Sequence, residues 1–381
     1  MPKSKKNPVR LLQSSLSIDQ FLDRYWQKKP LLLRNAFPNF KQLVTREALF
    51  ELASRDDTES RLIWRRGNAW QVQHGPLAAP DIRKLPKKNW TLLVQDVQHH
   101  IDAAWQVLSQ FAFISYARLD DLMVSYAADG GGVGPHYDSY DVFLIQSLGR
   151  RRWRIAKEFD PATRSDTPLK ILTSFTAENE WLLEPGDLLY LPPDYAHEGI
   201  ADGECMTLSV GFRAPRQYEL ALAYLQELAA QHNFGRLLCD KDLAATEQPA
   251  KLDRPLIARY RQLLEGVDWQ QREFAQFLGI YLSEPKPHTE FEPPHRPLNA
   301  ATFARRVAAG GIRLDGKTRM LYFGAQFFIN GEHATIAAGD RPPFARLADR
   351  RHSDVSRCSA SAMTMLYDWY RAGFIKLVDH P

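Results

Sequence analysis

The stretch from Gly130 to Asp138, GGGVGPHYD, constrains the fold more than any other part of this 381-residue chain. A glycine run leads into His136-x-Asp138, and a second histidine, His197, follows 61 residues after the first. Side chains alternate between the two faces of a strand, so on a strand His136 and Asp138 would offer ligand atoms to one point in space. With His197 they would form the two-histidine, one-carboxylate set of non-haem Fe(II) oxygenases, which leaves coordination positions open.

An H-x-D pair alone is more often a feature of a surface strand than a set of metal ligands, but three neighbouring patterns favour the metal site. A strand predicted at 122–127 leads into the glycine run, and an apolar, β-favouring run, 141–146, follows the pair directly, which places the pair at the start of a buried strand. The turn at 147–149 then returns the chain through an arginine-rich strand, 150–155. A further turn and strand, 182–191, end at two prolines just before His197. Together these patterns predict an antiparallel jelly-roll barrel with a metal at its mouth.

Four segments give the chain a resemblance to the cupin-like JmjC-domain 2-oxoglutarate oxygenases and, among them, to the bacterial ribosomal oxygenases. They are FLDRYWQKKPLLLRNAF (21–37), GGGVGPHYDSYDVFLIQSLGRRRWRI (130–155), EPGDLLYLPPDYAHEG (184–199) and LSVGFRAP (208–215). The resemblance covers nearly the whole chain. It implies Fe(II) bound by His136, Asp138 and His197, with 2-oxoglutarate as the co-substrate. It also implies 3-hydroxylation of an arginine in a large-subunit ribosomal protein.

The arginine-rich strand contains a candidate for binding the distal carboxylate of 2-oxoglutarate. Alternation along this strand places Arg151 on the inner face with Trp153 and turns Arg150, Arg152 and Arg154 outward. A buried arginine offers two parallel N–H donors to a carboxylate. In the family that the chain resembles, a basic residue at this place in the motif binds the co-substrate, which agrees with Arg151.

Substrate contacts are less constrained by the sequence. A cationic arginine substrate would need a carboxylate close by, and we consider Asp129 or Asp141 for this role. Tyr137 could stack on the substrate or pack on the outside of the barrel. Asp194 and Glu198 flank His197 and are expected at the rim rather than on the metal.

The predicted fold class is α+β, because 381 residues exceed one ordinary domain and the element types change along the chain. We expect a double-stranded β-helix (jelly-roll, cupin-like) catalytic domain at 1–214. A helical module at 215–286 and a winged-helix-like domain at 287–381 follow it.

The helical module contains apolar residues at helical spacing in three segments, 216–232, 256–264 and 274–282. Their apolar stripes could be buried inside the chain or against a second copy. Members of the family that the chain resembles use this region for dimerisation, which implies a homodimer.

In the C-terminal domain we expect a helix at 300–309 and a hairpin formed by 319–329 and 333–337, with its turn at Asn330-Gly331. Winged helices bind DNA in many proteins and other proteins in some. From Arg296 to the C-terminus there are 13 Lys and Arg against 7 Asp and Glu, yet few of them line any single helix. Protein interaction is therefore favoured over nucleic-acid binding, which stays an alternative.

Two local signals stand out near the N-terminus. Ser17 and Gln20 have the spacing of a capping box and predict a helix that begins at Ile18. Two β-favouring runs on either side of Gly67-Asn68 predict a hairpin.

Composition limits the other functional classes. Three widely spaced cysteines, Cys205, Cys239 and Cys358, argue against a disulfide framework or a thiolate zinc site. The chain has neither a signal-peptide pattern at its start nor an 18-residue apolar run, so we expect a cytoplasmic protein.

Several alternative functions remain open. The same metal set would serve a JmjC histidyl hydroxylase or an N-methyl-lysine demethylase equally well. A cupin sensor coupled to a DNA-binding winged helix is a non-enzymatic alternative, but a sensor has no need of a complete metal set together with Arg151. A structural zinc cupin would need a fourth ligand, which the sequence does not offer in an obvious place.

Overall fold

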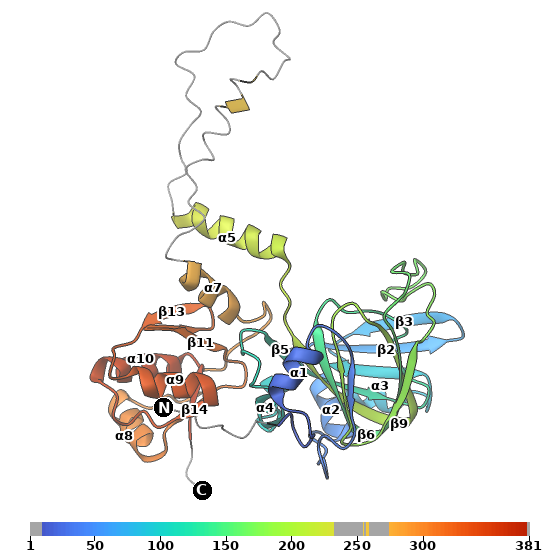
Figure 1. The fold of residues 1–381 in the computed structure, drawn as a ribbon. Helices are drawn as coiled ribbons and strands as arrows, with labels where there is room; N and C mark the ends of the chain where they lie inside the picture. The colour runs from blue at the N-terminus through green and yellow to red at the C-terminus, as the bar shows by residue number, and fades with distance from the viewer. Residues whose placement is uncertain (1–9, 232–253, 255–256, 259–273, 379–381) are drawn as a thin grey trace, which may run out of the picture.

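The computed structural model describes residues 10–231, 254, 257–258 and 274–378 (Figure 1). A β-rich N-terminal part lies beside a mixed C-terminal part, and the helices α5 and α7 lie above the C-terminal part in the view of Figure 1. The predicted helix at 256–264 falls almost entirely outside the described residues. Among the helices that are described, none is both long enough and apolar enough to cross a membrane.

The N-terminal part alternates short helices with the strands of one large sheet. Its elements are α1 (Ile18–Arg24), β1 (Leu31–Leu33), α2 (Arg46–Ala53), β2 (Ser60–Arg66), β3 (Ala69–His74), α3 (Ala79–Arg83), β4 (Trp90–Val94), the 3-10 helix η1 (Val97–His99), α4 (Ala104–Ser109), β5 (Leu119–Ala127), β6 (Asp141–Ala156), β7 (Asn179–Leu183), β8 (Leu188–Leu191) and β9 (Ala196–Phe212).

These strands form a nine-stranded sheet in the order β1-β8-β6-β9-β5-β4-β2-β3, with β7 also paired to β6. The two longest strands, β6 and β9, pair antiparallel from Asp141 opposite Phe212 to Ala156 opposite Ala196. The sheet curls on itself around this long ribbon (Figure 1). The jelly-roll barrel predicted from the sequence is therefore confirmed.

An aromatic cluster fixes one face of β6. Helix α1 begins with the predicted capping box, in which Ser17 and Gln20 bond reciprocally. It places the Phe21 ring 5.6 Å from that of Phe143 and 5.0 Å from that of Tyr190. Because alternate residues of a strand point to opposite faces, the neighbours of Phe143 on β6 turn toward the interior of the barrel.

Turn chemistry explains where strands end. The predicted hairpin at Gly67-Asn68 is confirmed, since Arg66 of β2 lies opposite Ala69 of β3.

In the C-terminal part, the prediction of a single strand over 319–329 is wrong. Gly324, at a φ of +60°, divides it into β11 (Met320–Phe323) and β12 (Gln326–Ile329). Strand β13 (Glu332–Thr335) follows the Asn330-Gly331 turn, as expected.

The C-terminal part has its own core. Besides β11 to β13, it contains α8 (Ala300–Gly310), β10 (Ile312–Leu314), α9 (Arg341–Arg350), β14 (His352–Ser353), α10 (Ala360–Arg371) and β15 (Ile375–Leu377). Its strands form two three-stranded sheets, β14-β10-β15 and β11-β12-β13. Phe303, Phe327 and Phe344 are fully buried in a cluster separate from that of the barrel.

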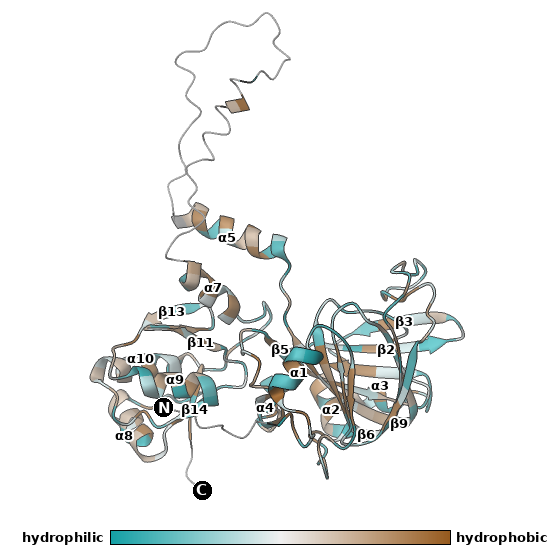
Figure 2. Cartoon of the chain, in the orientation of Figure 1, coloured by the Kyte–Doolittle hydropathy of each residue, from teal (hydrophilic) through white to brown (hydrophobic). Residues whose placement is uncertain are grey.

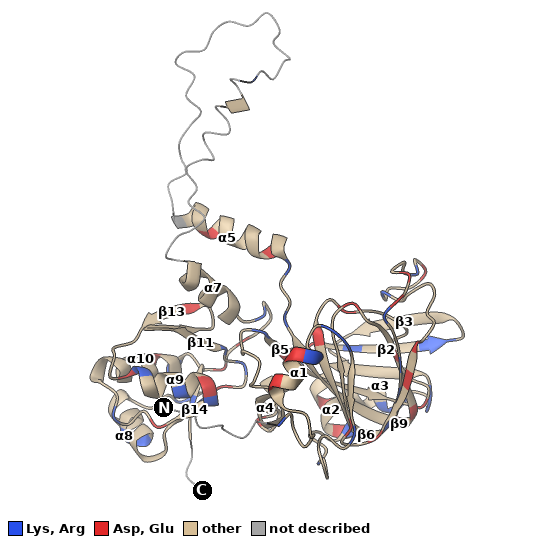
Figure 3. Ribbon diagram, in the orientation of Figure 1, with Lys and Arg blue, Asp and Glu red and all other residues tan. Residues whose placement is uncertain are grey.

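In the described part of the chain, two helices lie between the barrel and the C-terminal part in sequence, α5 (Gln217–Gln231) and α7 (Phe274–Ser283). Tyr224 and Leu228 of α5 pack against Phe277 of α7. Both helices are rich in apolar residues (Figure 2), and α7 has no charged residue at all (Figure 3).

Candidate active site

The two histidines of the predicted metal set are joined backbone to backbone. The His136 amide donates to the His197 carbonyl at 3.0 Å, and the His197 amide donates to the His136 carbonyl at 2.7 Å. His197 lies at the start of β9, but His136 forms only an isolated bridge, and β6 begins later, at Asp141. The prediction that His136-x-Asp138 starts a strand is therefore wrong. The backbone bridge to His197, not strand alternation, positions His136.

The glycine run allows this close approach. A Cβ atom at Gly132 would lie 2.6 Å from the carbonyl oxygen of Gly199, and one at Gly131 would lie 2.2 Å from that of Trp90. These neighbours are backbone atoms, which cannot move aside as the end of a flexible side chain can. The run therefore passes in close contact with β4 and β9, and this path fixes the backbone position of His136.

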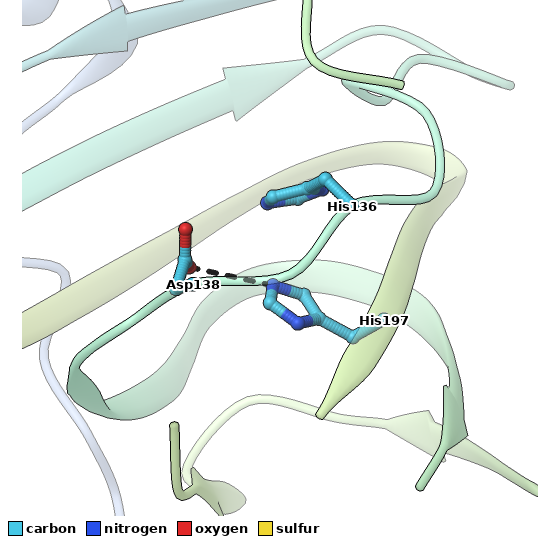
Figure 4. A group of neighbouring side chains, drawn as sticks. All are labelled: His136, Asp138 and His197. Atoms are coloured by element: carbon cyan, nitrogen blue, oxygen red, sulfur yellow. Dashed lines mark ion pairs between the residues drawn. The ribbon is translucent and has the colours of Figure 1, made fainter. Parts of the chain in front are cut away.

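His136, Asp138 and His197 each offer one ligand atom, and these atoms lie within 4.8 Å of one another (Figure 4). His197 Nε2 is 3.7 Å from Asp138 Oδ2. The Nδ1 atoms of His136 and His197 each lie 2.9 Å from a backbone carbonyl oxygen, of Gly134 and Tyr195 respectively. Each carbonyl oxygen accepts a hydrogen bond from Nδ1–H, and the Nε2 lone pair of each ring is then free for a metal.

The protonation state of His197 also suits a ligand. Burial, with a further contribution from His136, lowers the pKa of His197 to about 4. The ring is therefore neutral at neutral pH, as metal binding requires. The donor set, two imidazoles and one carboxylate, fits Fe(II) with open positions.

Arg151 lies inside the barrel, as alternation along β6 predicted. It is 3% exposed and donates to Ser125 Oγ at 3.1 Å and to the Gly199 carbonyl at 3.2 Å. Its Nε atom is buried without an acceptor. No carboxylate of the described residues forms an ion pair with it. A buried guanidinium group that no carboxylate neutralises attracts an anion strongly.

The neighbouring arginines face outward, again as predicted. Arg150 pairs with Asp202 at 2.9 Å, Arg152 with Glu180 at 2.6 Å and Arg154 with Glu198 at 2.8 Å. Glu198 is thus engaged on the outside of the sheet and is not a metal ligand. Arg151 differs from all three in having no acidic partner in the described part of the chain.

One cavity of about 600 Å³ joins the metal set to Arg151. Apolar side chains of β6, including Val142, Leu144 and Trp153, line one wall. Ser125 of β5 and Thr207 of β9 lie opposite each other across the strand pair and line the floor beside Arg151. The cavity is large enough for a small dicarboxylate and a substrate side chain together.

Comparison with known proteins places this site in a family. A sequence profile of the JmjC domain matches residues 106–220, and one of the ROXA-like winged helix matches residues 266–376. Over 339 residues the chain is 35% identical to the ribosomal protein uL16 3-hydroxylase of Escherichia coli K12, covering 88% of this chain and 90% of that protein. The chain belongs to the JmjC-domain ribosomal oxygenases.

Solved structures of these oxygenases agree over nearly the whole length. The X-ray structure of E. coli YcfD matches with a TM-score of 0.86 at 32% identity, covering 96% of this chain and 99% of that one. The structure of this E. coli ribosomal oxygenase in complex with cobalt and 2-oxoglutarate matches with a TM-score of 0.83 at 32% identity, covering 95% and 98%. The match to the winged-helix profile confirms the predicted fold class of the C-terminal part.

Two of the residues considered for substrate contact in this ribosomal oxygenase do not line the cavity. Asp141 is fully buried behind β6, where it accepts from Tyr190 Oη at 2.6 Å and Gln27 Nε2 at 2.9 Å. Asp129 accepts from the Gly203 amide and pairs with Lys88. Both predictions are wrong, because each carboxylate already serves local structure. Tyr137 does line the cavity and lies 5.0 Å from Phe159, ring to ring.

The cavity instead contains two carboxylates that sequence reasoning missed, Asp120 and Asp121, together with Tyr140 and Arg61. The sequence pattern indicated a strand that begins at Leu122, but β5 begins at Leu119. With that start, alternation places Asp121 on the same face as Met123 and Ser125, toward the interior.

Proposed function

We propose that this protein is a 2-oxoglutarate- and Fe(II)-dependent hydroxylase that oxidises an arginine of a large-subunit ribosomal protein. The observation that carries the proposal is a single cavity that contains both the metal set and a buried arginine with which no described carboxylate forms an ion pair. In the overall reaction, 2-oxoglutarate and O2 would yield succinate and CO2, and one oxygen atom would enter a substrate C–H bond.

Each part of the cavity has a role in this proposal. His136, Asp138 and His197 would hold Fe(II), which supplies the redox chemistry when bound. Arg151 would bind the distal carboxylate of 2-oxoglutarate through its guanidinium group, beside the hydroxyl of Ser125. The apolar wall of β6 would keep water away from the reacting atoms. The relative whose structure contains cobalt and 2-oxoglutarate supports a divalent metal ion and 2-oxoglutarate as the molecules bound in this cavity.

A cationic substrate side chain fits the acidic end of the cavity. Asp120 and Asp121 lie there, on the strand that also contributes Ser125. A guanidinium group forms two parallel hydrogen bonds with a carboxylate, so an arginine suits this end. The E. coli relative is named a uL16 3-hydroxylase, which supports a ribosomal protein as substrate and carbon 3 as the position oxidised. A ribosomal substrate also fits a cytoplasmic location.

The proposal is tested by incubating the purified protein with Fe(II), 2-oxoglutarate and arginine-containing peptides of uL16. Substrate-stimulated succinate release and a mass gain of about 16 Da on arginine are expected, both lost when a chelator removes the metal. Peptides in which N-methyl-lysine or histidine replaces the arginine serve as controls. Turnover of those peptides alone would favour the demethylase or histidyl-hydroxylase alternatives, and no turnover with any peptide would contradict the proposal.

We also propose a homodimer formed through α5. Its residues Tyr218, Leu222 and Leu225 share one face at i, i+4 and i+7 and are 62%, 55% and 39% exposed, respectively. Leu222→Asp is expected to shift the protein from dimer to monomer in sedimentation experiments, because it buries a charge at the interface. Ala230→Asp adds the same charge to the same helix away from this face and should leave the dimer intact. A monomeric wild-type protein would contradict the proposal.

A further inference from the structure

A lysine from the C-terminal half of the chain forms ion pairs with the carboxylates at the acidic end of the cavity. Lys286 lies shortly after α7, far in sequence from the barrel. Its Nζ atom is 3.0 Å from Asp96 Oδ2 and 3.6 Å from both Asp120 Oδ1 and Asp121 Oδ2. The lysine side chain is 19% exposed and those of Asp96 and Asp121 are 6% and 11% exposed, so the cluster is largely shielded from water.

Within this cluster, Asp121 faces the cavity and Lys286 does not. Lys286 is also the only cation among the described residues that forms an ion pair with Asp121. The Asp96 amide donates to Asp121 Oδ2 at 3.4 Å, and no described residue donates a hydrogen bond to Oδ1. Gly211, which also lines the cavity, lies beside Oδ1, and a Cβ atom there would be in van der Waals contact with it at 3.4 Å.

The charge of Asp121 depends on this contact. Burial raises its pKa to about 7, and the negative charges of Asp96 and Asp120 act in the same direction, while Lys286 opposes them. Asp120 has two further cations, Arg213 at 3.2 Å and Arg319 at 3.7 Å, so it does not depend on Lys286 alone. The charged or titratable groups around Asp121 are Asp96, Asp120, Tyr140, Lys286 and Arg319.

We propose that Lys286 is a positioning residue for substrate binding, which holds Asp121 ionised and oriented toward the cavity so that it binds the cationic side chain of the substrate. The inference rests on the proposed function and extends it to the C-terminal half of the chain. The connection between the helical module and the winged helix then supplies part of the electrostatic environment of the substrate site.

The test compares Lys286→Met with Lys286→Arg in the hydroxylation assay on the uL16 peptide. Lys286→Met is expected to raise the KM for peptide about tenfold or more, because a protonated Asp121 no longer attracts the arginine, whereas kcat stays within about twofold. Lys286→Arg keeps the positive charge and should restore most of the affinity. Turnover of 2-oxoglutarate without peptide should be unchanged, since Lys286 does not line the cavity.

The pH profile separates this role from a merely structural one. An aspartate binds a cation only when it is ionised, so the KM of the wild type should fall as pH rises through about 7. Without the lysine the pKa of Asp121 rises, and the fall in KM should occur at higher pH. At high pH, Lys286→Met should therefore approach the wild type. If this variant does not fold, Lys286→Gln, which keeps a hydrogen-bond donor, is measured in its place with the same expectation.

Lys317→Met is the matched control. Lys317 is also buried at the junction of the two parts, but it bonds to the Glu290 carbonyl and lies 3.4 Å from Glu292, away from the cavity. Its loss should leave the KM and its pH profile unchanged. Equal effects of Lys286→Met and Lys317→Met, or a pH profile of Lys286→Met identical to that of the wild type, would overturn the proposal. Failure of the wild type to hydroxylate any peptide would instead remove the proposed function itself.

Discussion

Replacing His136 with alanine is expected to abolish both metal binding and substrate-stimulated succinate release. In the proposed site the imidazole would contribute one of the three ligand atoms that the described residues offer, and the remaining pair, Asp138 and His197, would hold Fe(II) much more weakly. Loss of a hydrogen-bond partner of a metal ligand already costs about 10–100-fold in affinity or activity, so loss of the ligand itself should cost more than about a hundredfold. Titration with Fe(II) or Co(II) followed by metal analysis measures the binding directly.

The fold should survive this change, because His136 is held by its backbone. Its amide and carbonyl groups bond to His197, and alanine keeps both bonds. Circular dichroism and thermal unfolding should therefore resemble those of the wild type without metal. His74→Ala, at the exposed end of β3, removes a histidine from the same domain and should leave metal binding unchanged. Full metal occupancy in His136→Ala would show that the three-residue site is assigned incorrectly.

The residues of the metal set could be named from the sequence, but their geometry could not. Strand alternation suggested that His136 and Asp138 share a face, yet no strand contains them. Their convergence depends on a bridge between His136 and His197, which are 61 residues apart. Local periodicity contains no information about such long-range pairing. By contrast, Arg151 was placed correctly, because it lies within a regular strand where the two-residue period holds.

The acidic end of the cavity escaped prediction for a related reason. Asp141 looked available because it follows the metal motif, but its partners Gln27 and Tyr190 come from segments 114 and 49 residues away. Asp121 lies just before the strand predicted at 122–127, whereas β5 begins at Leu119 and includes it. Its partner Lys286 lies 165 residues further along the chain. Only the three-dimensional arrangement shows which acidic residues are used by local structure and which ones face the cavity.

The second large effect is expected for Arg151→Met, which should abolish binding of 2-oxoglutarate. The guanidinium group is buried, and no carboxylate of the described residues pairs with it, so its charge is available to the co-substrate. Removing one member of a buried, hydrogen-bonded charge pair costs about 2–5 kcal/mol, which corresponds to a rise in Kd of about 30-fold to several thousandfold. Calorimetric titration of the metal-loaded protein with 2-oxoglutarate measures this change.

The stability of the protein without co-substrate should not fall in Arg151→Met, although binding of 2-oxoglutarate is lost. This difference distinguishes a binding role of Arg151 from a structural one. Without co-substrate, Arg151 bears the cost of a buried charge with only neutral partners, Ser125, Thr207 and the Gly199 carbonyl. Methionine removes that cost, so Arg151→Met should unfold at the same temperature as the wild type or a higher one. Arg152→Met, the matched control on the outer face, loses only the exposed pair with Glu180 and should bind 2-oxoglutarate normally. Equal loss of binding in both variants, or loss of stability in Arg151→Met alone, would show that Arg151 supports the barrel rather than the co-substrate.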